Sequence, residues 1–363
     1  MNQYKFIHIL WSGGALFNKR IIEIFNDEEN DFDIDDHLFV TPYKHIYDEI
    51  CSFANVVFEQ EINPRSAELV NKYSEFGDWV FLHGMCSTTE ALKIKYKNRR
   101  KIIWRTWGHD IGGYPYKKRD ILRNIVKCFL NFLWKNEVKS FKAIGVANSV
   151  DKIVLEDRFG KINTMTLNYP VKGNIELYNS AIKKEKKVRK TVNVLVGHSG
   201  IDTDNHFEVI DRLKKYCNED VCFIFVLSYG DQEYIEKVKE YVKRNCNDKY
   251  RLILETMPYE KYVETLADVD VAILDGKNSY ALANVSMLLF FKKKLFLNRN
   301  GTLAKAFKME NIPFCYTDEI DNMSIEEFSS KVDFPNTTPT SLMPVGYERA
   351  VERWKTMLAS LDK

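Results

Sequence analysis

The chain has 363 residues, of which 45% are hydrophobic and 13% aromatic, so it can bury a large core and is long enough for two domains. Its 53 Lys and Arg nearly balance 51 Asp and Glu, which argues against a protein whose overall charge attracts nucleic acid. Seven scattered cysteines, never spaced C-x-x-C, argue against a disulfide framework or a zinc site and fit a reducing cytosol. No apolar run is long enough for a signal peptide or a membrane span.

Short runs of β-forming residues alternate with helical patterns along both halves of the chain. The predicted strands are 6–10, 37–40, 55–58, 79–82, 101–105 and 143–147, then 192–196, 221–227, 251–254, 269–274 and 294–297. This alternation is typical of α/β domains in which helices cover a parallel sheet. Between the two sets, the polar stretch at 178–190 is either a linker or an exposed helix, and we place the domain boundary near 174–191.

Glycine-bearing loops follow three predicted strands of the first half. Ser12-Gly13-Gly14 follows the first strand, His83-Gly84 the fourth, and Arg105 opens the loop "RTWGHDIGG" after the fifth. Open parallel sheets bind ligands at the carboxyl ends of their strands, and two such domains create a cleft between them. We therefore expect these loops to line one wall of a ligand site.

The basic segment 93–123 carries eleven Lys and Arg but only Asp110 and Asp120, which favours an anionic ligand or surface. It overlaps a predicted helix within 115–142 whose apolar residues recur at helical spacing. They are Ile121, Leu122, Ile125, Phe129, Phe132 and Leu133. The helix either lies on a bilayer or is an ordinary amphipathic helix that covers the first sheet.

The second half has a similar turn, Gly197-His198-Ser199-Gly200, between a predicted strand and a helical run that begins at His206. Free backbone N–H groups and a helix dipole would favour a diphosphate there, although such turns also occur where nothing binds. Ser228 and Tyr229 follow the next strand and add hydroxyl groups. Tyr259 either stacks on a nucleotide base or is a surface aromatic residue.

Several blocks of sequence carry a resemblance that extends over nearly the whole chain. They are "FIHIL" through "FNKRIIEIFN", "FLHG", "IIWRTWGHDI", "VLVGHSG", "DNH", "SYGDQEYIEKVKE", "YEKYVETLADVD", "LFLNRN" and "GYERAVERW". In this order they resemble the bacterial TDP-N-acetylfucosamine:lipid II N-acetylfucosaminyltransferases, the 4-acetamido-4,6-dideoxygalactose transferases.

The resemblance implies a GT-B architecture of two facing Rossmann-like domains with an interdomain cleft. We expect an acceptor-binding domain at 1–175, a nucleotide-sugar-binding domain at 190–340, and a helix at 341–363 that packs back toward the first domain. It also implies a TDP-sugar donor, a polyprenyl-diphosphate-linked saccharide acceptor, no required metal or other cofactor, and a place on the cytoplasmic face of the membrane. Such an enzyme would serve synthesis of a bacterial surface polysaccharide.

Carried onto this chain, the family pattern matches His83, Gly84, Trp104, Trp107, Gly108, Asp110, Gly197, Ser199, Gly200, Tyr229, Gly230, Asn298 and Arg299. The chain departs from it at His109, where the family has Ala, at His198, where it has Asn, and at 281–284, where it has a Gly-rich turn. From the strand ends and the resemblance together we predict donor-binding residues Gly197, His198, Ser199, Gly200, Ser228, Tyr229, Tyr259, Asn284, Asn298 and Arg299. The predicted acceptor-binding residues are Ser12, Gly13, Gly14, Gly84, Arg105 and Trp107.

Glycosyl transfer needs a base for the acceptor hydroxyl and a positive or hydrogen-bonding partner for the departing diphosphate. We predict Asp110 as the base, with His83 or His109 as rivals; the alternative is that Asp110 only shapes its loop. Arg299 would neutralise the diphosphate, or else pair with a carboxylate on the surface.

Three D-x-D pairs, which begin at Asp33, Asp202 and Asp268, are poorly placed for a metal clamp, because the pattern puts them in an acidic loop, at a helix cap and before a strand. Other readings of the whole chain stay open. They are a transferase with another nucleotide-sugar or a protein or glycan acceptor, a GT-B-type nucleotide-sugar epimerase, and a non-catalytic binding subunit.

Overall fold

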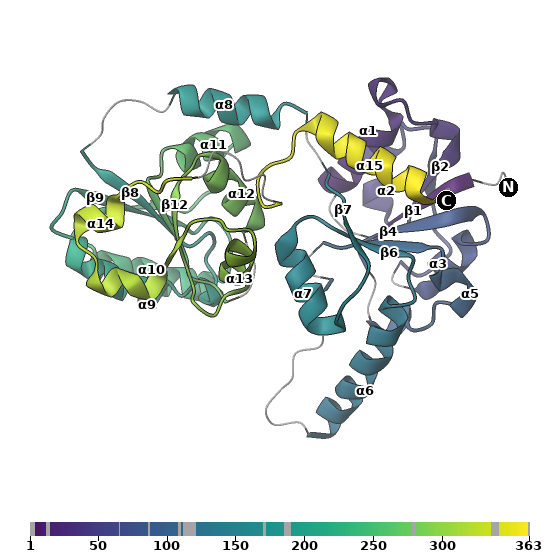
Figure 1. The fold of residues 1–363 in the computed structure, drawn as a ribbon, viewed down its shortest axis with the longest axis horizontal. Coiled ribbons are helices and arrows are strands. Elements are labelled where there is room, and N and C mark those ends of the chain that lie inside the picture. Colours follow the sequence, from purple (N-terminus) through teal and green to yellow (C-terminus); the bar gives the residue numbers. More distant parts are fainter. Residues whose placement is uncertain are drawn as a thin grey trace. The chain divides into compact units, whose positions relative to one another are not determined.

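The structure, a computed structural model, describes residues 4–11, 15–64, 66–85, 88–107, 110–111, 121–169, 172–184, 190–277, 281–334 and 341–361. The chain forms two compact units (Figure 1): Met1–Val171 together with Val345–Lys363, and Lys172–Pro344. Each unit contains one parallel sheet with helices packed against it, which confirms the predicted α/β fold.

The sheet of the first unit has the strand order β3-β2-β1-β4-β5-β6-β7, and every pairing is parallel. Its strands are β1 (Tyr4–Leu10), β2 (His37–Thr41), β3 (Val56–Phe58), β4 (Gly77–His83), β5 (Ile102–Arg105), β6 (Ala143–Val146) and β7 (Thr164–Thr166). Its helices are α1 (Ala15–Asn26), α2 (Lys44–Ile50), α3 (Ala67–Tyr73), α4 (Thr88–Ala91), α5 (Tyr96–Arg99), α6 (Ile121–Val138), α7 (Ser149–Phe159) and α15 (Tyr347–Leu361), with 3-10 turns η1 (Glu28–Asn30) and η2 (Ile34–Asp36).

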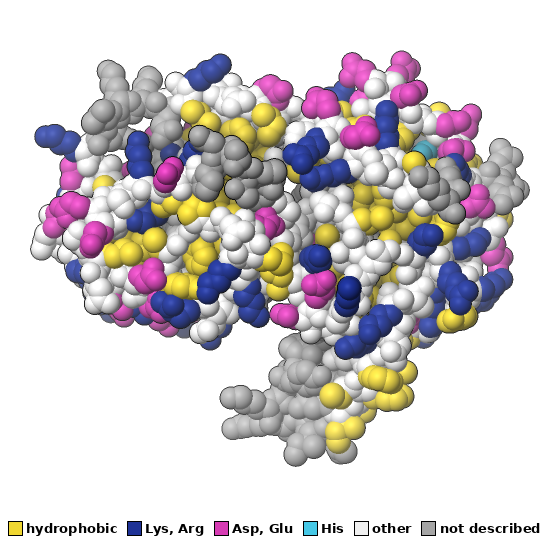
Figure 2. Space-filling view, in the orientation of Figure 1, with side chains coloured by type: hydrophobic (Ala, Val, Ile, Leu, Met, Phe, Trp, Pro, Cys, Tyr) yellow, Lys and Arg dark blue, Asp and Glu magenta, His cyan; other side chains and the backbone are white. Residues whose placement is uncertain are grey.

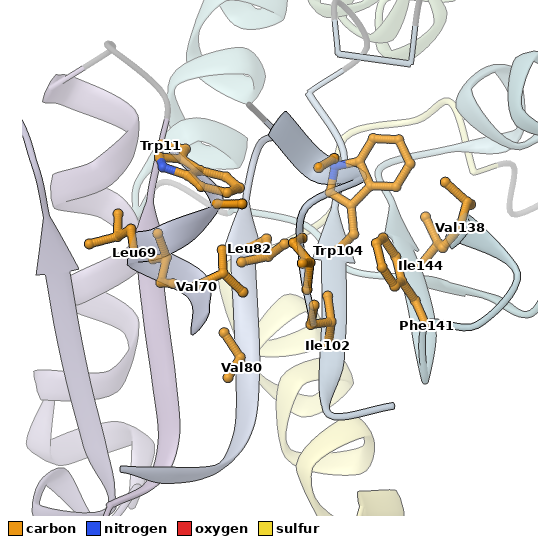
Figure 3. Packing of buried hydrophobic residues seen from close by; sticks show 14 of the residues in the cluster. Trp11, Leu69, Val70, Val80, Leu82, Ile102, Trp104, Val138, Phe141 and Ile144 are labelled. Carbon is orange, nitrogen blue, oxygen red and sulfur yellow. The ribbon is translucent and has the colours of Figure 1, made fainter. Parts of the chain in front are cut away.

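Two hydrophobic clusters in this unit draw on alternate residues of the strands, because successive side chains of a strand point to opposite faces. In the first cluster, Trp104 packs against Val138 and Ile144, and Trp11 lies over Leu69 and Val70 (Figure 3). Helices on both faces explain why consecutive strand residues such as Phe6 and Ile7 are both buried.

The C-terminal helix α15 belongs to the first unit, although the whole second unit precedes it in the chain. Its Trp354 is fully buried in the second cluster, with its ring centroid 5.3 Å from that of Phe25 and 5.7 Å from that of Phe81. The Trp354 Nε1–H donates to the Asn168 carbonyl at 2.9 Å, so the buried indole nitrogen is satisfied.

The sheet of the second unit has the order β10-β9-β8-β11-β12-β13 and is also parallel. Its strands are β8 (Val192–Val196), β9 (Val221–Val226), β10 (Tyr250–Ile253), β11 (Val271–Leu274), β12 (Lys294–Leu297) and β13 (Cys315–Tyr316). Its helices are α8 (Asn174–Lys184), α9 (His206–Leu213), α10 (Gln232–Asn245), α11 (Tyr259–Ala267), α12 (Leu282–Phe290), α13 (Thr302–Met309) and α14 (Ile325–Ser329), with 3-10 turns η3 (Asp202–Asp204), η4 (Lys214–Tyr216) and η5 (Thr317–Asn322).

Two strands differ from the sequence prediction, whereas the polar stretch follows one of its two alternatives, a helix. Strands β7 and β13 were missed; both are edge strands of three and two residues with half-buried side chains, so they lack an apolar run. The polar stretch predicted to begin at Tyr178 lies largely in helix α8, which buries Tyr178 and Ala181. The two units divide just before this helix, between Val171 and Lys172.

Candidate functional site

All strands of each sheet are parallel, so the loops that follow them gather at one edge, here called the carboxyl edge. In the second unit this edge begins at Gly197, directly after β8. Gly197 has a φ of +67°, and an added Cβ would lie 2.6 Å from His206 Nε2 and 3.0 Å from Asp204 Oδ2. Only glycine fits this conformation beside two buried side chains.

The backbone N–H groups of this turn are all engaged within the chain. His198 N and Ser199 N donate to Asp204 Oδ2 at 2.9 and 3.0 Å. Gly197 N donates to the Ile273 carbonyl and Gly200 N to the Tyr229 carbonyl. The prediction that these N–H groups are free to hold a diphosphate is therefore wrong, because the Asp204 carboxylate occupies the place expected for the anion. The Asp202/Asp204 pair was expected at a helix cap, but the N-cap residue of α9 is Asn205 and, among the described residues, no side chain caps that helix.

The side chains of His198, Ser199 and Asp204 form a compact buried cluster. His198 Nδ1 lies 2.8 Å from Asp204 Oδ1, and Ser199 Oγ lies 3.3 Å from both His198 Nε2 and Asp204 Oδ2. Burial by itself would raise the pKa of Asp204, but the hydrogen bonds from His198 hold it below its usual value. The Asp204 carboxylate therefore orients the His198 imidazole through this contact.

Behind the turn lies His206, whose side chain is fully buried at the start of α9. Its Nδ1 is 3.2 Å from Tyr234 Oη, and its Nε2 has no hydrogen-bond partner among the described residues. Burial lowers the pKa of His206 to about 4, so the ring is neutral at pH 7. The sequence analysis did not connect His206 or Asp204 with the side chains of the turn. Both lie in the run "DTDNH", which begins two residues after Gly200 and was the available signal.

A second acidic residue, Asp275, follows β11 and was also missed. Asn205 Nδ2 donates to its carbonyl and its Oδ2 at 2.8 and 3.1 Å, and Asn298 Nδ2 donates to its carbonyl and Oδ1 at 3.1 and 3.3 Å. The predicted donor residue Asn298 thus helps to fix a carboxylate at the carboxyl edge. A carboxylate flanked by amides suits recognition of hydroxyl groups.

The remaining predicted donor residues fall into two groups. Tyr229 is 53% exposed beside the half-buried Ser228, so its side chain is accessible to a ligand. Tyr259 and Asn284 are tied to neighbouring helices instead: Tyr259 Oη lies 2.7 Å from Tyr178 Oη, and Asn284 Nδ2 donates to Tyr262 Oη at 2.8 Å.

Arg299 follows β12 and forms a bidentate pair with Asp318, with both N···O distances 2.7 Å. Its guanidinium also lies 3.9 Å from the Tyr316 ring centroid. The structure therefore agrees with the second of the two expectations for Arg299, an arginine paired with a carboxylate near the surface.

In the first unit, the loop after β5 is shaped by Asp110. Its Oδ2 accepts from Trp104 Nε1 at 3.0 Å and its Oδ1 accepts from the Trp107 N–H at 2.8 Å. This is the loop-shaping arrangement that was the alternative to a catalytic role. Four predicted site residues, Ser12, Gly13, Gly14 and His109, lie outside the described residues.

His83, the rival base, is the middle of a buried hydrogen-bonded chain that sequence reasoning missed. His37 Nδ1 lies 2.9 Å from His8 Nε2, His8 Nδ1 lies 2.9 Å from His83 Nε2, and His83 Nδ1 lies 2.5 Å from Tyr169 Oη. All three histidines are at most 1% exposed. Burial lowers the pKa of His37 and of His83 to about 3 and that of His8 well below its usual value. The chain runs from β2 across β1 to the carboxyl edge of β4.

The other predicted acceptor residues surround Tyr169. Trp107 stacks on Tyr169 with ring centroids 5.0 Å apart, and the Arg105 guanidinium lies 4.6 Å from the Tyr169 centroid. Gly84, with a φ of +95°, donates its N–H to the Arg105 carbonyl at 3.0 Å. The structure therefore brings His83, Gly84, Arg105 and Trp107 together at the carboxyl edge of the first unit.

Each of the three D-x-D pairs has a carboxylate that accepts a backbone N–H within the chain. Asp33 accepts from Asp35 N, Asp204 from the Gly197 turn as described, and Asp270 from Asn193 N at 2.8 Å. In the part of the chain that the structure describes, no group of three or more His, Cys, Asp or Glu could hold a metal ion.

Helix α6 exposes apolar side chains rather than covering the sheet along its full length. Ile125, Val126, Phe129 and Phe132 are each 57–61% exposed, whereas Trp134 and Val138 near its end are buried in the core. Figure 2 shows this apolar surface on the part of α6 that extends away from its unit. Among the described residues, no helix combines the length and the apolar character needed to cross a membrane.

Solved structures of similar fold are glycosyltransferases and related enzymes. A glycosyltransferase from Rickettsia africae shares 12% identity, covers 100% of both chains and gives a TM-score of 0.63. HepE from Anabaena, solved with UDP, shares 13% identity over 99% of this chain and 100% of its own, with a TM-score of 0.61. Sucrose-phosphate synthase from Thermosynechococcus elongatus shares 9% identity over 99% and 98% of the two chains, with a TM-score of 0.57. At such identities the likeness shows the fold, which is of the GT-B type.

Sequence similarity identifies the family directly. The family described as 4-alpha-L-fucosyltransferase, glycosyl transferase group 56, matches residues 3–363, which includes both units and the returning helix α15. This match confirms the resemblance drawn from the sequence blocks. The chain therefore belongs to glycosyl transferase group 56, the 4-alpha-L-fucosyltransferase family, and is a glycosyltransferase.

Proposed function

We propose that this glycosyltransferase moves a deoxyamino sugar from a TDP-sugar to a polyprenyl-diphosphate-linked saccharide during synthesis of a bacterial surface polysaccharide. The observation that carries the proposal is the family match over residues 3–363. The family is described as a 4-alpha-L-fucosyltransferase family, and fucose is a 6-deoxy sugar, which agrees with the donor class that the sequence blocks imply. HepE, solved with UDP and with UDP-glucose, supports a nucleotide-sugar as the donor type.

The donor would bind at the carboxyl edge of the second unit. Tyr229 offers an exposed ring for the base, Asp275 suits a sugar or ribose hydroxyl, and His198, oriented by Asp204, offers a ring nitrogen for a hydrogen bond to the diphosphate. The turn backbone is not the diphosphate seat in this proposal, because Asp204 already accepts its N–H groups. We also propose that no metal takes part, since each D-x-D pair has a carboxylate already engaged with the backbone.

Nucleotide binding tests the donor class. With EDTA present, TDP at 100 times its dissociation constant should stabilise the protein by about 2.7 kcal/mol, because it binds only the native state. Differential scanning calorimetry with TDP, UDP, GDP and CMP measures the shift in unfolding temperature, and Mg²⁺ should not increase it. Stabilisation by any of the others without stabilisation by TDP would contradict the TDP-sugar assignment.

We propose Asp110 as the base that accepts the proton of the acceptor hydroxyl. The Asp110→Asn substitution should lower kcat by roughly 10²–10⁴-fold, because the amide cannot take up the proton. A radiolabelled sugar-transfer assay measures this loss. Trp104→Phe is the matched control, since it removes the indole hydrogen bond to Asp110 but keeps the carboxylate. Equal losses in both variants would show that Asp110 only shapes the loop.

We propose that the exposed face of α6 contacts the cytoplasmic surface of the membrane, where a lipid-linked acceptor resides. Apolar side chains supply the insertion energy, and the sequence places Lys117, Lys118, Arg119 and Arg123 beside them, which favours anionic lipids.

Vesicle sedimentation tests this contact. The protein should bind phosphatidylglycerol vesicles more strongly than phosphatidylcholine vesicles, and the pair Phe129→Glu and Phe132→Glu should weaken binding at least tenfold, since each buried Phe contributes about 1.5–3 kcal/mol. The control pair Ile34→Glu and Tyr96→Glu changes exposed apolar residues elsewhere in the unit. A control that loses as much binding as the α6 pair would refute a specific role for this helix.

A further inference from the structure

Arg105 is a nearly buried cation at the carboxyl edge of the first unit. It is the last residue of β5, and the whole residue is only 4% exposed. Its Nε donates to the Leu167 carbonyl at 2.7 Å. No carboxylate lies within ion-pair distance of its guanidinium among the residues that the structure describes.

Two buried or half-buried acidic side chains in this part of the unit form no ion pair with Arg105. Asp151, 6% exposed, accepts the Ala147 N–H at 3.2 Å, and Asp110 accepts from Trp104 and Trp107. Burial raises the pKa of Asp151 even though Arg105 acts in the opposite direction, so the influence of the guanidinium on this carboxylate is the weaker one. A buried guanidinium without a counter-charge is energetically unfavourable unless an anion completes it.

The surroundings hold the guanidinium in one place. The Tyr169 and Trp107 ring centroids lie 4.6 and 5.6 Å from it, and both rings can stabilise a cation through their faces. On the neighbouring strand, a Cβ on Gly145 would lie 3.0 Å from Arg105 Cδ and 2.9 Å from Leu167 Cδ1. Glycine at this position therefore leaves the space that the arginine stem occupies.

Tyr169 is itself fixed by the buried histidine chain. Its hydroxyl lies 2.5 Å from His83 Nδ1, which continues to His8 and His37. The ring against which the guanidinium packs is thus tied to the middle of the sheet, and the arginine is held in position before any ligand arrives. Such pre-organisation reduces the entropy lost on binding.

We propose that Arg105 is the binding site for the diphosphate group that links the acceptor saccharide to its lipid, and that Tyr169 is a positioning residue for it. A guanidinium offers parallel N–H donors that match two phosphate oxygens, and the lack of a carboxylate partner leaves these donors for the ligand. This inference rests on the proposed function for the identity of the acceptor. Its chemical content, recognition of a diphosphate by the first unit, does not depend on which sugar is transferred.

Calorimetric titration of the full chain with farnesyl diphosphate and with inorganic pyrophosphate tests the site. Arg105→Met should weaken the binding of both probes at least 30-fold, and Arg105→Lys about 10-fold, because a lysine ammonium lacks the bidentate geometry. The control Arg100→Met removes an exposed arginine of the same unit and should leave both affinities within about twofold. Binding of either probe by Arg105→Met at wild-type affinity would overturn the proposal.

Three further measurements keep the test decisive. Gly145→Ala leaves the charge in place but displaces the arginine stem, so it should weaken farnesyl diphosphate several-fold even if Arg105→Met fails to fold. Tyr169→Phe should raise KM for the lipid-linked acceptor several-fold with kcat nearly unchanged, whereas general damage to the fold would lower kcat as well. The affinity for TDP should be unchanged in every variant. A variant that loses affinity for both TDP and pyrophosphate would assign Arg105 to the donor site and overturn the inference. If the wild type does not bind TDP, only the proposed donor is refuted.

Discussion

Lowering the pH from 7 to 5 should destabilise the first unit by about 4 kcal/mol through His37 and His83 alone. Each has a folded pKa of about 3 against an ordinary value of 6.5, so the unfolded chain binds more protons than the folded unit throughout this window. The free energy of unfolding therefore falls as the pH drops below 6.5 and levels off only near pH 3. At pH 5 each histidine contributes about 2 kcal/mol, since one pKa unit corresponds to about 1.4 kcal/mol.

Tryptophan fluorescence during urea denaturation measures this effect in the first unit alone, because all six tryptophans lie in it. His37→Phe should lower the slope of stability against pH by about 1.4 kcal/mol per pH unit between pH 6 and 4, the amount expected for one proton. His45→Asn removes an exposed histidine of the same unit and should leave the slope unchanged. A wild-type stability that stays flat between pH 7 and 5 would contradict the assignment of neutral, buried imidazoles.

Gly197→Ala should destabilise the second unit by roughly 2–4 kcal/mol and abolish the stabilisation by TDP. The new Cβ would lie 2.6 Å from His206 Nε2, and the His206 ring is fully buried, so the contact is relieved only by moving packed atoms. The positive φ of +67° adds about 1 kcal/mol for a residue with a side chain. Because the same turn carries His198 and Ser199, its displacement also removes the groups proposed to meet the diphosphate.

Gly173→Ala is the matched control for this substitution. Gly173 lies in the same unit with a φ of +81°, but an added Cβ would have no neighbour within 4 Å. It should therefore show only the backbone effect of about 1 kcal/mol. Far-UV circular dichroism follows both units, and a transition that tryptophan fluorescence does not share belongs to the second unit. Equal losses in the two variants would mean that contact with His206 and Asp204 has no part in the requirement for glycine.

Strand prediction succeeded where burial leaves a strong pattern in the sequence. Central strands such as β9 and β11 are packed on both faces and are apolar along their whole length. The edge strand β7, with the sequence Thr-Met-Thr, is half-buried and carries no such requirement. Its place in the sheet is decided by pairing with β6, which is a property of the folded chain.

The turn at Gly197 was located correctly from the sequence, but the acceptor of its backbone N–H groups was wrongly expected to be a diphosphate. The strand, the glycine and the following helix were all evident from the local sequence. The acceptor of these N–H groups is the side chain of Asp204, which lies five residues after Ser199 in the chain and contacts the turn. Local spacing alone does not distinguish a carboxylate that caps a helix from one that fills an anion site.

By itself, the sequence determined the fold class, the order of most strands along the chain, the carboxyl-edge loops and the family, because each depends on residues close together in the chain or on ordered blocks. Only the tertiary structure decided which distant residues meet. His8, His37 and His83 are joined because the strand order β2-β1-β4 makes neighbours of segments 29 and 75 residues apart. Among the described residues, Arg105 has no carboxylate partner because Asp110 and Asp151 accept hydrogen bonds from backbone and indole N–H groups instead. Contacts of this kind arise from the packing of whole sheets and helices, which no local pattern of residues records.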